Sequence, residues 1–224
     1  MKNLTSVMGL FMVATAFATD HANLESNRPL RFDDAMSAKF GERSVSLGVM
    51  AGDDQSEFSV ELKSGFAPNR HAAIRLVSAD SGSGIELSYF AGIRREIRGD
   101  PALAYKIEVF APSDNDKAHA KLRLIASKTA QRYDRIHFNI DLETGPKEGA
   151  AFILAYSKPL GVPRRFDSTF VAEVGARSIG DEAWFGLGIR HQADPKSVID
   201  AGIEFRRLSN KNEIRARLGW SSAI

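Results

Sequence analysis

The sequence contains no cysteine, has almost no net charge, and has no long hydrophobic run after its first 18 residues. The lack of cysteine excludes disulfides, thiolate metal sites and a lipid-anchoring cysteine. The 30 Lys and Arg residues nearly balance the 28 Asp and Glu residues, which gives no indication of a nucleic-acid partner. Because no internal run could cross a bilayer as a helix, a membrane location would require a closed β-barrel.

Residues typical of catalysis or metal binding are also scarce. None of the histidines is spaced as a metal-binding pair, so we predict no metal and no cofactor. His137, Asn139 and Asp141 share one strand face and could form an acid–base cluster. A hydrogen-bond network inside the protein accounts for them more simply, so we predict no catalytic residues and no enzyme activity. The five histidines are His21, His71, His119, His137 and His191.

The N-terminus resembles a secretory signal. Lys2 precedes an uncharged, mostly apolar run over residues 4–18, which ends on the small-residue pattern Ala16-Phe17-Ala18. This run is shorter than the roughly 20 residues that a transmembrane helix needs. We therefore predict a signal peptide over residues 1–18, with a buried N-terminal helix as the alternative.

The rest of the chain shows strand periodicity. In residues 183–190, Ala183, Phe185, Leu187 and Ile189 alternate with Trp184, Gly186, Gly188 and Arg190. Residues 198–206 and 213–220 repeat the pattern, separated by polar turns. Similar segments recur from residue 43 onwards, about twelve in all and each of roughly 9 to 12 residues, a length that crosses a bilayer when tilted. The facing of residues 150–156 stays undetermined, because both of its faces are apolar.

These features predict an all-β fold, a single antiparallel up-and-down transmembrane β-barrel of about 12 strands. The expected organisation is a signal peptide (1–18), an irregular N-terminal segment (19–41) and the barrel (42–224). Mid-strand glycines such as Gly186, Gly188 and Gly202 are interpreted as adaptations to a curved wall. The alternative is a soluble periplasmic barrel or sandwich that binds an apolar ligand inside and keeps its charged face outside.

If the charged face lines a pore, the chain is an outer-membrane channel or transporter for small solutes. Its partners are then outer-membrane lipid, a small-molecule solute and, during biogenesis, the barrel-assembly machinery. The inward positions carry an excess of about five positive charges, which favours anions. A structural barrel whose lumen is filled by ion pairs remains a further alternative. The predicted pore-lining residues are Arg75, Arg94, Lys106, Glu108, Arg123, Arg135, Glu173, Arg177, Arg190, Asp200, Glu204, Arg206, Arg215 and Arg217.

The C-terminal third resembles a known family. The strand motifs Gly186–Arg190, Ile199–Gly202 and Leu218–Trp220 occur in this order, after the AYSKPLG run that begins at Ala155. This order is similar to the tail of outer-membrane barrels associated with the meta-cleavage pathway of phenol degradation, which are presumed transporters. The resemblance covers residues 155–220 and implies a transported solute that is a small organic acid or an aromatic compound.

Overall fold

A computed structural model describes residues 24–25, 28–53, 55–97, 99–114, 117–145, 148–162, 165–178, 181–209 and 211–224. Twelve strands lie within these ranges, as the alternation predicts, and the predicted signal peptide lies outside them. The strands are β1 (Arg43–Gly52), β2 (Ser56–Ala67), β3 (Arg70–Ala79), β4 (Gly82–Arg94), β5 (Ala102–Pro112), β6 (His119–Gln131), β7 (Asp134–Glu143), β8 (Gly149–Val162), β9 (Arg165–Arg177), β10 (Glu182–Asp194), β11 (Ser197–Leu208) and β12 (Lys211–Ala223).

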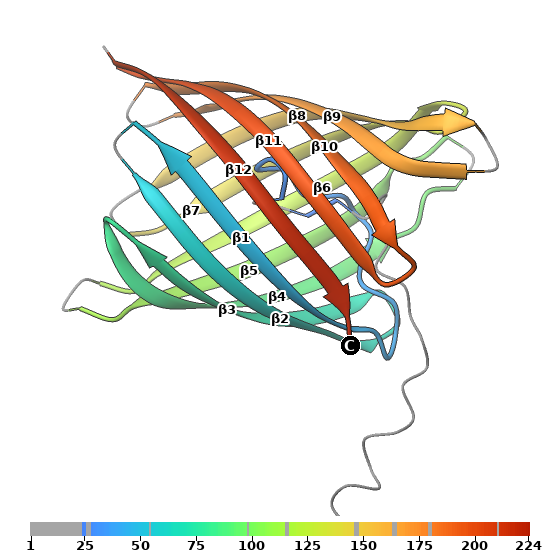
Figure 1. The fold of residues 1–224 in the computed structure, drawn as a ribbon, viewed down its shortest axis with the longest axis horizontal. Coiled ribbons are helices and arrows are strands. Elements are labelled where there is room, and N and C mark those ends of the chain that lie inside the picture. The colour runs from blue at the N-terminus through green and yellow to red at the C-terminus, as the bar shows by residue number, and fades with distance from the viewer. Residues whose placement is uncertain are drawn as a thin grey trace, which may run out of the picture.

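The strands form one closed antiparallel barrel in which each strand pairs with its sequence neighbours and β1 pairs with β12 (Figure 1). Closure leaves no unpaired sheet edge, so the backbone hydrogen bonds of the wall are satisfied between strands. The connections that follow the odd-numbered strands, from β1–β2 to β11–β12, lie at one end, which we term the mouth end. The C-terminus and the alternate connections lie at the other, the terminal end. The predicted up-and-down barrel is confirmed.

Apolar side chains cover the outside of the wall and charged side chains point into it. Phe58, Leu87 and Leu218 are 49%, 55% and 60% exposed on the outer face, whereas Arg123 and Glu204 are 2% and 0% exposed. The alternative arrangement, with an apolar interior and a charged exterior, is therefore wrong. Among the described residues, no helix is long and apolar enough to cross a membrane.

The structure defines the facing of β8 and its junction with β9. In β8, Ala151, Ile153 and Ala155 are buried on the inner side, while Phe152 and Leu154 are exposed outside. Pro159 does not end the strand: β8 extends to Val162 and β9 begins at Arg165, with a register shift at residues 160–161. A bulge at this point accommodates the local irregularity around Pro159.

The irregular segment before β1 lies inside the barrel. Its described residues, 24–25 and 28–42, are termed the inner segment, and Figure 1 shows this blue chain running within the wall before it joins β1. Leu24, Leu30 and Phe32 are buried against an apolar patch of the inner wall. That patch consists of Ala151, Ile153, Ala155, Val171 and Trp184. The apolar inner face of β8 is thus explained, because the inner segment covers it.

The mid-strand glycines make room for the inner segment. A Cβ atom at Gly202 would lie 2.5 Å from the carbonyl oxygen of Pro29, and one at Gly188 would lie 2.7 Å from the Pro29 ring. A Cβ at Gly186 would meet Leu30 at 2.8 Å. Glycine within a strand is expected where another backbone approaches closely. Close approach of the inner segment therefore accounts for these three glycines without any appeal to wall curvature.

Candidate functional site: a charged lumen with an internal segment

Arg31 anchors the inner segment to the β10–β11 wall. Its Nε and Nη2 atoms donate to the Glu204 carboxylate at 2.6 Å, and Nη1 donates to Glu182 at 2.7 Å. The guanidinium also lies 4.2 Å from the ring centroid of Trp184, a favourable cation–π geometry. The backbone N–H of Arg31 donates to Glu173 at 2.9 Å. A planar guanidinium suits this site because it can make two parallel bonds to one carboxylate and still reach a second.

Asp33 is bound by three neighbouring strands. Its carboxylate accepts from Arg123 Nη1 at 2.5 Å and lies 3.6 Å from Lys106 Nζ. The Asn139 side chain accepts from the Asp33 backbone N–H at 2.7 Å and donates to its carbonyl at 3.0 Å. Lys106 is directly opposite Arg123 in the β5–β6 register, and Arg123 is opposite Asp141 in the β6–β7 register. The alternation of the strands thus brings one residue from each onto a single lumen-facing row.

Asp34 is fully buried beside the β6–β7 wall. Its carboxylate is bound by Arg135 and lies 3.7 Å from His137 Nδ1. Burial raises the pKa of Asp34 to about 6, against the opposing effect of Arg135. His137 contacts Ser127 Oγ at 3.0 Å and Ser157 Oγ at 2.8 Å. His137 therefore belongs to a hydrogen-bond network of the lumen, as the simpler of the two sequence interpretations held.

Arg28 and Glu25 attach the start of the inner segment to β2 and β12. Arg28 binds Ser221 and lies 3.5 Å from Glu61, while Glu25 accepts from Lys63 and from Arg28. Burial alone would raise the pKa of Glu25, but Lys63 and Arg28 outweigh it and hold the pKa well below its usual range. The inner segment is thus paired with the wall at Glu25, Arg28, Arg31, Asp33 and Asp34.

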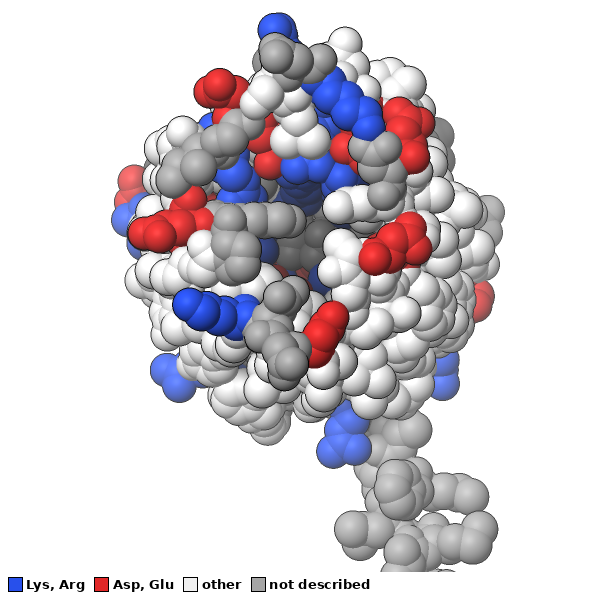
Figure 2. Space-filling view, turned by 90° about the vertical axis from the view of Figure 1, so that its left-hand side faces the viewer, with Lys and Arg blue, Asp and Glu red and all other residues white. Residues whose placement is uncertain are grey.

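The lumen remains hollow between the inner segment and the mouth end. A cavity of about 310 Å³ opens there, and Figure 2 shows this end as a hollow with Lys and Arg on its inner wall. We term it the mouth cavity. It is lined by seven cationic and four anionic side chains, with Arg31 and Trp184 among the lining. The cationic residues are Arg31, Lys121, Arg123, Arg177, Arg206, Arg215 and Arg217, and the anionic residues are Glu57, Asp141, Glu143 and Glu182.

The excess of positive charge expected for the whole lumen is not found. Several carboxylates at strand ends also pair inside the barrel, and the count of inward positions made from the sequence did not include them. The inner segment adds four further acids, Glu25, Asp33, Asp34 and Glu42, against three cations, Arg28, Arg31 and Lys39. Cationic excess is therefore confined to the mouth cavity. The missed strand-end residues are Glu57, Glu143, Glu182 and Glu213.

The predicted lining residues divide into groups by position. Lys106, Arg123, Arg135, Glu173 and Glu204 contact the inner segment directly. Other members pair with neighbouring side chains on the inner face of the wall: Arg75 with Glu57 and Glu86, Glu108 with Lys106 and Lys121, Arg177 with Glu143 and Glu182, Arg206 with Glu182 and Glu213, Arg215 with Glu213, and Arg217 with Glu204.

Arg94, Arg190 and Asp200 complete the predicted set. Arg190 and Asp200 are opposite one another in the β10–β11 register and are 2% and 1% exposed. Arg94 lies at the terminal end of β4. Its side chain is 41% exposed and donates to the Pro101 carbonyl in the β4–β5 connection. Whether solute passes any of these side chains stays a prediction.

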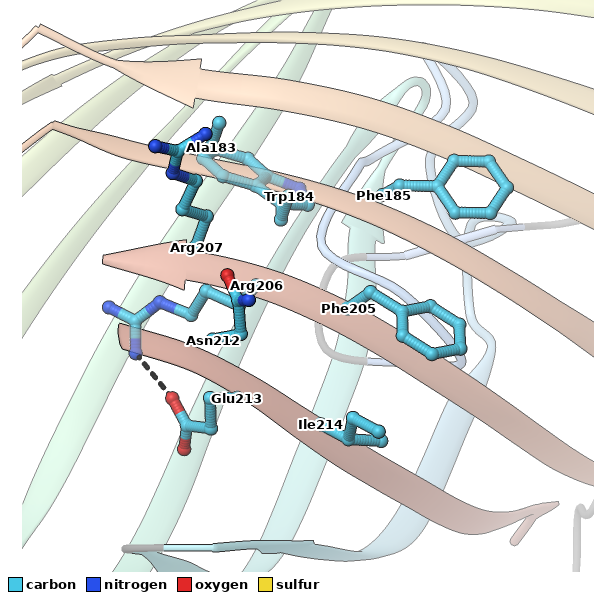
Figure 3. A pocket seen from close by; sticks show the side chains of 9 residues that line it. All are labelled: Ala183, Trp184, Phe185, Phe205, Arg206, Arg207, Asn212, Glu213 and Ile214. Atoms are coloured by element: carbon cyan, nitrogen blue, oxygen red, sulfur yellow. Dashed lines mark hydrogen bonds and ion pairs between the residues drawn. The ribbon is translucent and has the colours of Figure 1, made fainter. Parts of the chain in front are cut away.

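A second concavity, of about 410 Å³, crosses β10, β11 and β12 near the mouth end. Figure 3 shows Phe185 and Phe205 side by side on neighbouring strands, with Ile214 next along the row. All three are exposed on the outer face, whereas Arg206 and Glu213 form an ion pair of 3.3 Å on the inner side. The lining of this concavity thus combines apolar residues of the outer face with inner-face residues such as Arg206 and Glu213.

Within the part of the chain that the structure describes, no three His, Cys, Asp or Glu residues are grouped as a metal site. A closed antiparallel barrel with an apolar exterior and a charged, partly filled lumen defines the porin-like class of fold. The fold is similar to the KdgM porin in complex with disordered oligogalacturonate, with a TM-score of 0.67 and 11% identity over 81% of this chain and 99% of that chain.

Two further solved structures have similar folds. The NanC porin gives a TM-score of 0.60 and 9% identity over 81% of this chain and 100% of that chain. An outer membrane channel from Pseudomonas putida F1 gives a TM-score of 0.61 and 9% identity over 85% of this chain and 98% of that chain. No family model and no curated protein sequence matches this chain. At such low identities the likeness concerns the fold.

Proposed function

We propose that this protein is an outer-membrane channel for small hydrophilic solutes. The observation that carries the proposal is the combination of an apolar outer wall with a charged cavity that opens at one end of a closed barrel. Exposed apolar rows of this extent are unfavourable in water and favourable in lipid. In this account the chain is exported through residues 1–18 and inserted by the barrel-assembly machinery, with the mouth end facing outside the cell.

The lining of the mouth cavity favours anions. Seven cationic side chains face four carboxylates across a confined space, and a local cationic excess raises the concentration of anions there. Arg206, Arg215 and Arg217 line this cavity together with Arg31 of the inner segment. The KdgM porin, named as a complex with oligogalacturonate, shows that a barrel of this fold accommodates an acidic solute. The family resemblance of residues 155–220 favours small organic acids or aromatic compounds.

Planar-bilayer recording tests this function. The purified protein is inserted under a KCl gradient, and the reversal potential gives the ratio of chloride to potassium permeability. We expect small conductance steps and a reversal potential on the anion-selective side. A cation-selective reversal potential would refute the charge argument, whereas heat-modifiable gel migration in the absence of any conductance would refute the channel.

A structural barrel is the second candidate function. It is favoured by the inner segment, which occupies the lumen and is held there by ion pairs on several strands. Liposome swelling separates the two candidates, because a filled structural barrel admits no solute. A channel admits small solutes at a rate that falls with their size.

A further inference from the structure

The Asp33 site has the composition of a carboxylate-binding site. Arg123 and Lys106 supply two cations to one carboxylate, at 2.5 Å and 3.6 Å. Asn139 binds only the main chain of Asp33 and so holds this residue in register without touching its carboxylate. Different wall residues therefore bind the carboxylate of Asp33 and its main chain.

The same site is within reach of the mouth cavity. Arg123 and Asp141 line that cavity, as does Arg31, two residues before Asp33. Nε and Nη2 of Arg123 bind Asp141 at 2.5 and 2.6 Å, whereas Nη1 binds Asp33 and the Arg31 carbonyl. The bidentate bond to Asp141 fixes the guanidinium in place, so Nη1 stays oriented towards its ligand. An anion that enters the cavity thus meets a preorganised cation whose present ligand belongs to the inner segment.

We propose that Lys106 and Arg123 form a binding subsite for the carboxylate of a small organic acid, and that Asp33 occupies it as an internal competitor. A carboxylate solute takes the place of the Asp33 side chain at Arg123 and Lys106, which releases the central part of the inner segment. The subsite deepens the proposed channel function and rests on it. Because Asp33 competes for the subsite, the apparent dissociation constant of a carboxylate solute is higher than its value for an unoccupied subsite. The ratio of the two values is set by how strongly Asp33 docks.

Trp184 provides a direct measurement. The chain has two tryptophans, so Trp220→Phe leaves only Trp184, whose ring lies under Arg31. This protein in detergent micelles is titrated with succinate, and in parallel with uncharged succinamide, at constant ionic strength. We expect a saturable change in Trp184 emission with succinate and none with succinamide. Asp33→Asn removes the charge of the competitor and should lower the half-saturating succinate concentration roughly tenfold.

Two further variants keep the test independent of any one substitution. Asn139→Ala removes the two hydrogen bonds to the Asp33 main chain and so weakens docking of the inner segment without changing the Asp33 carboxylate. It should also lower the half-saturating succinate concentration, and it replaces Asp33→Asn if that variant does not fold. Asp194→Asn, the same chemical change at an exposed site on the terminal end, should leave that concentration unchanged. Heat-modifiable gel migration establishes folding for each variant.

A disulfide gives a reversible lock in a chain without native cysteine. The Ala35 backbone N–H donates to Ser127 Oγ at 3.0 Å, so Ala35→Cys with Ser127→Cys places the two thiols on adjacent positions. The oxidised protein should lose the succinate response, and dithiothreitol should restore it. A response that persists in the oxidised protein, or that is unchanged by both Asp33→Asn and Asn139→Ala, would overturn the subsite. Anion-selective conductance without any succinate response overturns the subsite alone, whereas absent conductance overturns the channel.

Discussion

The barrel wall and the inner segment are held by different kinds of interaction. The wall is a continuous ladder of backbone hydrogen bonds between neighbouring strands, with side chains that alternate between the outside and the lumen. The described part of the inner segment has no strand or helix, and side-chain bonds of Arg31, Asp33 and Asp34 attach it to the wall. The wall is therefore expected to be stable without the segment, whereas the position of the segment depends on a few ion pairs and on the burial of Leu24, Leu30 and Phe32.

The largest expected effect concerns the outer face of the wall. Leu187→Arg places a charge among the apolar rows and should lower the free energy of unfolding in lipid vesicles by about 2 to 4 kcal/mol. Ser88→Arg is the matched control, because Ser88 faces the lumen beside Glu108 in the β4–β5 register. Urea titrations of both variants measure the difference. Equal losses for the two would contradict the assigned facing.

The next effect concerns the anchor of the inner segment. Arg31→Gln leaves Glu182 and Glu204 without this partner and removes the stacking on Trp184, so docking of the segment should weaken by about 2 to 3 kcal/mol. Proteolysis within the segment should become faster while heat-modifiable migration persists. Arg75→Gln, which breaks a pair between strands, should not accelerate that cleavage.

A steric change tests the same docking without altering charge. Gly202→Ala brings a Cβ atom to 2.5 Å from the Pro29 carbonyl oxygen, so the inner segment must shift. Crowding of this size typically costs about 1 to 3 kcal/mol, so docking of the inner segment should weaken. Because a displaced segment leaves more of the lumen open, the channel conductance should rise. At Gly48 the nearest atom to an added Cβ is the flexible Ser59 hydroxyl, so Gly48→Ala should leave conductance unchanged. Unchanged conductance in both variants would place the conducting path elsewhere.

The smallest expected effect is a pH dependence of docking. The pKa of Asp34 is raised to about 6 when the inner segment is docked. Between about pH 4 and 6, Asp34 is therefore protonated to a greater extent in the docked segment than in a segment released into solvent. Docking therefore strengthens as the pH falls through this window, by about 1 kcal/mol between pH 7 and pH 5. His137, Arg135 and Asp33 are the charged or titratable neighbours of Asp34.

Single-channel recordings at pH 5 and pH 7 measure this effect. We expect lower conductance at pH 5 in the native chain and no such difference in Asp34→Asn. The substitution should also favour docking at pH 7, because it removes the buried charge. A conductance that increases at pH 5 would contradict the assigned role of Asp34.

The regular part of the molecule could be predicted because its physical cause is local. A period of two places Leu187 outside and Trp184 inside whatever lies in the lumen, so strand number, facing and closure followed from the sequence. β8 is the exception, since both of its faces are apolar. Ile153 is apolar because it packs in the same cluster as Leu30 and Phe32, more than 120 residues earlier in the chain.

The inner segment could not be predicted because its contacts join residues far apart in sequence. Asp33 and Arg123 are 90 residues apart, and no local period signals their pairing. The glycines opposite Pro29 were visible in the sequence, yet close approach of a second backbone and curvature of the wall both call for glycine. Glu182 was missed because it lies at a strand end, where boundaries are the least certain part of a strand prediction.

Deletion of residues 25–38 tests the contrast between wall and segment most directly. The shortened protein is refolded in detergent, checked by heat-modifiable gel migration and recorded in planar bilayers beside the native chain. We expect a folded barrel with a larger single-channel conductance, because the wall keeps its own hydrogen bonds and the lumen loses its internal segment. A chain that no longer folds, or a folded barrel with unchanged conductance, would contradict the account.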